Sequence, residues 1–132
     1  MEKVVNMKNE LISVGIFICM ILAIIFSINY LDKTYASIEK LNIQLEQSIE
    51  KEDWSKSDML LKEMSNEMES NSSKVSIFVN HAEIDNINTE FSKLTQYVKY
   101  HNKEEAMASL YAVKFFFEHT LKLEKINTEN IF

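Results

Sequence analysis

The chain has 132 residues with no proline, one glycine and a formal net charge of −6, and lysine supplies all of its positive charge. A chain so poor in turn residues is not a hairpin-rich β protein, so we predict an all-α fold. The missing arginine and the acidic balance argue against nucleic-acid binding. The lone Cys19 excludes an intramolecular disulfide and a cysteine-based zinc cluster.

Residues 11–28 form an uncharged apolar stretch that follows a short N-terminal tail, residues 1–10. Extended to Tyr30, the segment 11–30 holds about 20 residues, enough at ~1.5 Å per residue to cross a hydrocarbon layer of ~30 Å. A cleaved signal peptide is the alternative, but its apolar region is normally shorter and is followed by small residues at a cleavage site. We therefore predict a transmembrane helix over residues 11–30 that contacts the lipid bilayer.

Residues 31–132 are expected to form one domain outside the cytoplasm. Lysines on the two sides of the apolar stretch are nearly equal in number, so the positive-inside rule alone does not set the orientation. A very short N-terminal tail before an apolar segment is typical of a signal anchor, which favours a cytoplasmic N-terminus. The predicted location is the cell membrane, crossed once, with residues 31–132 extracytoplasmic.

Beyond the membrane segment, apolar residues recur three and four positions apart, which is the spacing of one face of an α-helix. The first such stripe covers residues 31–51 and either follows the membrane helix or continues it. A second helix begins at an Asp53 N-cap, and further stripes predict helices over residues 74–100 and 103–126.

Polar residues mark the predicted connections between these helices. Residues 70–73, SNSS, are rich in side chains that compete for backbone hydrogen bonds and are predicted to form a loop. Asn102 with Glu105 resembles a capping box at the start of the last helix. Because such short connections place consecutive helices antiparallel, the predicted fold is an N-terminal transmembrane helix followed by an antiparallel four-helix up-down bundle.

Several features, taken in order, resemble a known bacterial family. An Asp53-Trp54 pair opens the second helix, the run HAEIDNI occupies residues 81–87, and the chain closes with Asn130-Ile131-Phe132. With the early membrane helix, these features resemble the domain of unknown function 4363 family, small single-pass membrane proteins of Gram-positive bacteria. The resemblance covers nearly the whole chain, and HAEIDNI is its most specific part. It implies an anchored helical domain and adds no activity.

The HAEIDNI run supplies the main candidate site, formed by His81, Glu83, Asp85 and Asn86. His81 and Asp85 lie four positions apart on one helix face, within reach of a hydrogen bond or a shared metal ion. A metal site requires a fuller ligand set than this pair provides, so none is predicted. We interpret the pair as a structural polar contact between helices, with recognition of a partner protein as the alternative.

Three apolar residues are candidate packing or partner anchors. Trp54 lies on the apolar stripe of its helix, where a tryptophan more often packs into the core than binds a partner. Ile131 and Phe132 end the chain with apolar side chains, although chain ends are generally polar and frayed. These two residues are expected either to fold back over the bundle or to contact a partner.

No catalytic constellation is present in the sequence. It lacks a glycine-rich phosphate loop and a nucleophile elbow, so we predict a non-enzymatic protein with no catalytic residues and no cofactor. The predicted function is protein–protein contact at the cell envelope, with a membrane or envelope protein as partner. One alternative is an extracytoplasmic ligand-sensing four-helix domain that signals through a membrane partner. Another is a homodimer through the first helix, with Asn42 as a register-setting polar residue.

Overall fold

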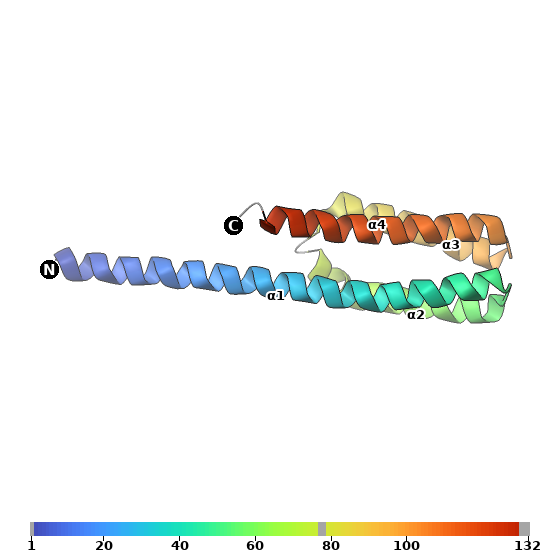
Figure 1. Ribbon diagram of the computed structural model, residues 1–132, viewed down its shortest axis with the longest axis horizontal. Helices are drawn as coiled ribbons and strands as arrows, with labels where there is room; N and C mark the ends of the chain where they lie inside the picture. Colours follow the sequence, from blue (N-terminus) through green and yellow to red (C-terminus); the bar gives the residue numbers. More distant parts are fainter. Residues whose placement is uncertain (1, 77–78, 130–132) are drawn as a thin grey trace.

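The computed structural model describes residues 2–76 and 79–129, which form four helices packed against one another. These are α1 (Glu2–Glu50), α2 (Trp54–Val75), α3 (His81–Lys99) and α4 (Lys103–Glu129). Consecutive helices run antiparallel, and α1 extends as one rod well beyond the other three (Figure 1). The all-α prediction is confirmed.

The apolar segment, residues 11–30, and the first helix of the bundle are one continuous helix. The prediction of a transmembrane helix ahead of four further helices is therefore wrong, because α1 is itself one of the four. No proline interrupts it, and its single glycine, Gly15, lies far from the bundle, so the i→i−4 hydrogen bonds continue unbroken to Glu50. The segment projects from the bundle, and Leu11 and Phe26 are 70% and 69% exposed.

The hydrophobic core lies between the second half of α1 and the facing stripes of the other three helices. Leu45, Ile49, Met64, Leu94 and Val113 are completely buried, and each such side chain stabilises the fold by about 1.5–3 kcal/mol. The most extensive interface is between α3 and α4, followed by those of α1 with α2 and with α4, whereas the α2–α3 interface is the smallest of these. The molecule is thus two helical hairpins joined mainly through α1 and α4.

The stripe of α1 that was predicted to mediate a dimer is used inside the chain. Asn42 is only 4% exposed, and its Oδ1 has no hydrogen-bond partner among the described residues. Its neighbours on the stripe, Ile38 and Leu45, belong to the core of the same bundle. Asn42 therefore packs inside the bundle and is not presented to a second copy, and a homodimer as such stays a prediction.

Two tight turns of the same construction join α1 to α2 and α3 to α4. One residue in each turn is left-handed, with a φ of 56° at Glu52 and 57° at His101. The next residue, Asp53 or Asn102, donates its backbone N–H to a carbonyl five positions back, at 2.9 Å in both turns. This pattern is the Schellman motif, formed here without glycine. We call the end of the bundle that carries both turns the turn end.

Both predicted N-caps are confirmed at these turns. The Asp53 carboxylate accepts a hydrogen bond from the backbone N–H of Lys56 at 3.1 Å. The Asn102 Oδ1 accepts one from the backbone N–H of Glu105 at 3.3 Å. Each cap satisfies a backbone donor that the first turn of a helix leaves unpaired, which explains why the helices begin directly after such short turns.

The predicted loop at residues 70–73 is wrong, because α2 continues through it to Val75. Its polar side chains bond back to carbonyls of the preceding helical turn instead of breaking the helix. Ser70 Oγ donates to the Glu67 carbonyl at 3.1 Å, and Asn71 Nδ2 donates to the same carbonyl at 2.7 Å. This use of serine and asparagine side chains is compatible with a helix.

The third helix begins later than predicted, at His81 and not at residue 74, and the fourth extends to Glu129. Asn80 sets the start of α3, because its Oδ1 accepts a hydrogen bond from the backbone N–H of Ala82 at 3.0 Å. We call this end of the bundle, where α1 leaves toward its apolar segment, the segment end.

Candidate functional site

The HAEIDNI residues occupy the first two turns of α3 at the segment end of the bundle. His81, Asp85 and Asn86 are exposed, and Glu83 is half-buried. Within residues 2–76 and 79–129, neither the His81 nor the Asp85 side chain forms a hydrogen bond or an ion pair. The structure thus places this pair on the surface of α3, and the interhelical contact predicted for it stays a prediction.

Among the residues that the structure describes, no group of three or more histidine, cysteine, aspartate or glutamate side chains is placed to hold a metal ion. The sole cysteine, Cys19, is exposed on the apolar segment of α1.

Trp54 lies at the turn end and packs against the core. Its ring stacks on His101 of the opposite turn, with ring centroids 5.0 Å apart and planes 8° from parallel. The Lys103 Nζ donates a hydrogen bond to the Glu50 carbonyl at 2.7 Å, which links the same two turns. Trp54 therefore packs against the core and joins the two hairpins. The other predicted anchors, Ile131 and Phe132, lie outside the described residues.

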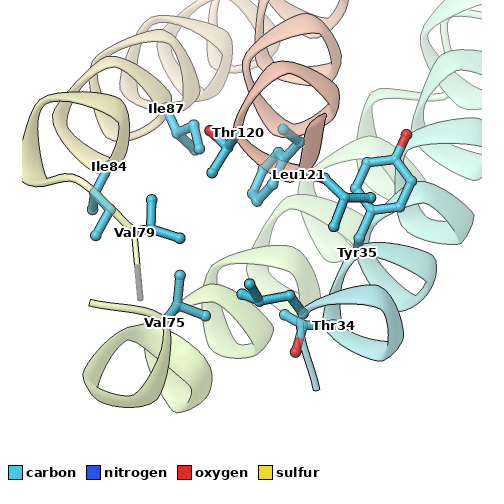
Figure 2. A pocket seen from close by; sticks show the side chains of 10 residues that line it. Thr34, Tyr35, Val75, Val79, Ile84, Ile87, Thr120 and Leu121 are labelled. Atoms are coloured by element: carbon cyan, nitrogen blue, oxygen red, sulfur yellow. The ribbon is translucent and has the colours of Figure 1, made fainter. Parts of the chain in front are cut away.

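A hollow lies between the helices in the half of the bundle nearest the apolar segment. Its larger part has a volume of about 340 Å³, and exposed residues of α2 and α3 form its rim. Its smaller part, about 50 Å³, lies at the segment end, where side chains from all four helices converge (Figure 2). The parts adjoin, because they share five lining residues: Thr34, Val75, Ile84, Ile87 and Phe117. The larger part lies within the ~300–1,000 Å³ range of small-molecule sites.

Sequence reasoning missed this hollow, although α2 carries a signal for it. The face of α2 toward α3 holds the small polar side chains of Ser65 and Ser72, one turn before and one turn after Met68. These side chains are too short to fill the space that leucine fills elsewhere in the bundle. The small α2–α3 interface is the structural consequence.

Thr120 is the unusual polar residue of the hollow. It lines the smaller part, is 8% exposed, and its hydroxyl has no hydrogen-bond partner among the described residues. Burying a hydroxyl without a partner costs roughly 1–3 kcal/mol. The hydroxyl oxygen itself is enclosed, so the surface of this part of the hollow is formed almost entirely by apolar atoms.

A second feature is an exposed surface between α1 and α4. We call it the α1/α4 face and define it by Ile43, Glu46, Tyr111, Phe115 and Glu118. Ile43, Tyr111 and Phe115 are 45%, 52% and 60% exposed. The Tyr111 hydroxyl donates to Glu46 Oε1 at 2.7 Å, and this carboxylate raises the pKa of the phenol. The face combines large apolar side chains with carboxylates, a combination found at protein-binding surfaces.

Tyr35 lies beside this face, at the point where α1 meets Glu118. Partial burial raises the pKa of Tyr35 from 10.0 to about 12, and the Glu118 and Glu39 carboxylates add to the shift. The nearby Glu118 and Glu39 carboxylates therefore favour the protonated form of the tyrosine. Neither Tyr35 nor the hollow was among the predicted site residues.

The segment end has one further connection between helices. The Tyr30 hydroxyl donates a hydrogen bond to Asn71 Oδ1, and the Lys74 Nζ lies 5.4 Å from the centre of the Tyr30 ring. These contacts fix the last turns of α2 to the point where the apolar segment of α1 enters the bundle. The position of the segment is therefore tied to the helices that surround the hollow.

Together, these observations define an all-α protein of four packed helices, the first of them long and apolar. Residues 25–131 match the family described as a domain of unknown function, DUF4363. Because the match covers most of the chain, the chain belongs to this family, and the family predicted from HAEIDNI is confirmed. Comparisons with curated proteins and with solved structures found no match.

Proposed function

We propose that the protein is a non-enzymatic, single-pass membrane protein that acts through contacts with another protein of the membrane or cell envelope. Residues 1–10 are the cytoplasmic tail, residues 11–30 the membrane span, and residues 31–132 the extracytoplasmic bundle. The apolar segment supports the anchor, since it is long and apolar enough to cross a bilayer and its side chains are exposed. A signal sequence has a similar composition, so the anchor requires its own test.

The observation that carries the proposal is the continuity of α1. From Leu31 onward one face of the helix is buried in the core of the bundle, and the residues before Leu31 form the exposed apolar segment. No flexible linker separates the two parts, so the bundle stands at a fixed position on the membrane surface. Such an arrangement suits a domain that binds a membrane-bound partner, because both proteins are then held at a fixed distance from the membrane surface.

The α1/α4 face is the surface best suited to this contact. Covering an exposed phenylalanine such as Phe115 with another molecule is favourable, because it removes apolar surface from water. A photo-crosslinking amino acid at position 115 should form a covalent crosslink to the partner in native membranes. The same amino acid at position 96, in place of the exposed Gln96 on α3, should not. Phe115→Glu should abolish the association with the partner without lowering the melting temperature. Equal crosslinking from positions 115 and 96 would contradict this assignment.

The hollow favours a second candidate, a bundle that binds a ligand and signals through a membrane partner. Its volume and its mostly apolar lining match those of small-molecule sites. A ligand that enters between α2 and α3 would change their small interface and, through the Tyr30–Asn71 hydrogen bond, affect the end of the apolar segment. The test is a ligand-dependent rise in the melting temperature that disappears when the hollow is filled.

A further inference from the structure

We propose that the hollow binds a compact organic amine. The apolar body of the amine lies on the floor of the larger part, and its ammonium group lies at the rim beside Glu69 and Asn88. This inference deepens the ligand-binding candidate and rests on it.

The floor of the larger part is apolar. Ile38 is buried there, and Phe91 and Phe117 are half-buried. Phe117 also lines the smaller part, whose surface is formed almost entirely by apolar atoms, so the apolar floor continues toward the segment end. Covering such a surface with an apolar body is favourable, because it removes the surface from water. The volume of about 340 Å³ is near the lower limit for small-molecule sites and suits a compact body.

The polar side chains that line the hollow gather at the rim of the larger part. Ser65, Glu69 and Ser72 on α2 and Asn88 on α3 are all exposed there. The Ser72 hydroxyl donates a hydrogen bond to the Glu69 carbonyl at 2.8 Å. The Glu69 carboxylate and the Asn88 amide, in contrast, form no hydrogen bond or ion pair with any residue that the structure describes. These two side chains therefore offer oxygen atoms to a bound group from the two helices that border the hollow.

The charge at the rim selects for a cation. Among the described residues, Glu69 is the one charged residue that lines the hollow, and no lysine lines either part. A carboxylate or phosphate ligand would lie beside Glu69 without a cation to pair with. An ammonium group, in contrast, donates hydrogen bonds to the Glu69 carboxylate and to the Asn88 side-chain carbonyl. An alkylamine carries this charge at neutral pH, as lysine does.

The experiment uses naphthylethylamine as the probe and the full chain in phosphatidylcholine nanodiscs, with isotope-labelled methionine methyl groups. Nuclear magnetic resonance reports each methyl group separately, once single methionine-to-leucine variants assign the signals. Met68 lines the larger part, whereas Met59 is exposed on α2 outside it. We expect the ring currents of the naphthyl group to shift the Met68 signal in a saturable manner and to leave the Met59 signal in place. Equal shifts of the two signals, or no shift of the Met68 signal, would overturn the proposal.

Met20 separates binding in the hollow from partition of the amine into the bilayer. It lies on the exposed apolar segment of α1, so an amine dissolved in the bilayer shifts the Met20 signal without saturation. A shift at Met20 without a shift at Met68 would show partition alone and refute the site.

Two analogues with the same ring system test the head group. Naphthylethanol is uncharged, and naphthylacetate is an anion. Naphthylethanol should bind about three- to five-fold more weakly than the amine, which is the effect of losing one exposed ion pair, and naphthylacetate should bind more weakly still. Equal affinities for the amine and the alcohol would overturn the assigned cation and leave the ligand-binding candidate standing. If none of the three compounds gave a saturable shift at Met68, both would be refuted.

Glu69→Gln and Glu63→Gln form a matched pair, because both remove one negative charge from an exposed position on α2 and only Glu69 lines the hollow. Glu69→Gln should weaken binding of the amine about three- to five-fold and leave binding of naphthylethanol unchanged. Glu63→Gln should leave both unchanged. Equal losses in the two variants would show a general effect of net charge and refute the contact at the rim.

Two neighbouring serines on α2 test the location of the site. Ser72 lines the hollow, whereas Ser73 does not, and both are exposed. Ser72→Phe should weaken binding of the amine by about five-fold or more, and Ser73→Phe should leave it unchanged. Equal affinities of the two variants would refute the site. Far-ultraviolet circular dichroism checks that each variant is folded.

Discussion

Glu52→Gly should stabilise the protein, although replacing a helix-forming residue by glycine usually destabilises one. Glu52 holds a φ of 56° in the turn between α1 and α2, a conformation that costs a residue with a Cβ atom roughly 1–2 kcal/mol. Glycine removes this cost and makes the unfolded chain more flexible, which costs about 0.4–1 kcal/mol. The expected net gain is about 0.5–1 kcal/mol.

The side-chain contacts of Glu52 change this expectation little. Its carboxylate lies 3.4 Å from the Lys103 Nζ, and both side chains are exposed, at 62% and 41%. An exposed ion pair of this kind is worth about 0–1 kcal/mol. His101 has the same backbone conformation but stacks on Trp54, a contact worth roughly 0.5–1.5 kcal/mol. His101→Gly should therefore be close to neutral or mildly destabilising.

The assay is thermal unfolding of the full chain in detergent micelles, followed by circular dichroism. Glu52→Gly should raise the melting temperature by about 2–6 °C. Glu63→Gly is the matched control, because Glu63 is exposed within α2; it should lower stability by about 1 kcal/mol. A Glu52→Gly variant that melts as low as the Glu63→Gly variant would refute the assigned turn.

Three further predictions concern single residues of the bundle. The pKa of Tyr35 is raised from 10.0 to about 12 in the folded state. The contribution of Tyr35 to the unfolding free energy should therefore be constant below about pH 10 and fall by up to about 2 kcal/mol toward pH 12. Tyr35→Phe should show a shallower loss over the same range, and identical pH profiles would contradict this prediction. Asn42→Leu should raise the unfolding free energy by about 1–2 kcal/mol, because it removes a buried Oδ1 that lacks a described partner; a decrease in denaturant midpoint would show that Asn42 is satisfied. His81→Ala and Asp85→Ala should each change stability by less than about 0.5 kcal/mol, since both side chains are exposed, and a larger loss in thermal melts would restore their predicted structural role.

Features that depend on local sequence were predictable. The apolar spacing along α1 and α4 predicted their buried faces, and Asp53 and Asn102 predicted the helix starts that follow them. A helix face and an N-cap are both set by residues within one or two turns of each other, so the sequence contains the necessary information.

Two kinds of feature were not predictable from the sequence: those for which two local structures compete, and those that depend on the distance between helices. Serines and asparagine at residues 70–73 suit a loop and a helix alike, and the outcome depends on whether their side chains find carbonyls in the preceding turn. The hollow depends on the separation of α2 and α3 along their whole length. His81 is exposed because it is the first residue of α3, and the start of α3 is set by the Asn80 N-cap.

The central claim is that α1 crosses the membrane and continues without interruption into the core of the bundle. The native Cys19 lies within the apolar segment, so a membrane-impermeant maleimide tests this claim directly. In intact cells, Cys19 should remain unmodified until the membrane is dissolved and the chain denatured, while Lys40→Cys in a Cys19→Ser chain should react from outside. Reaction of Cys19 in intact cells, or a mature protein whose mass shows that the segment has been removed, would contradict the claim.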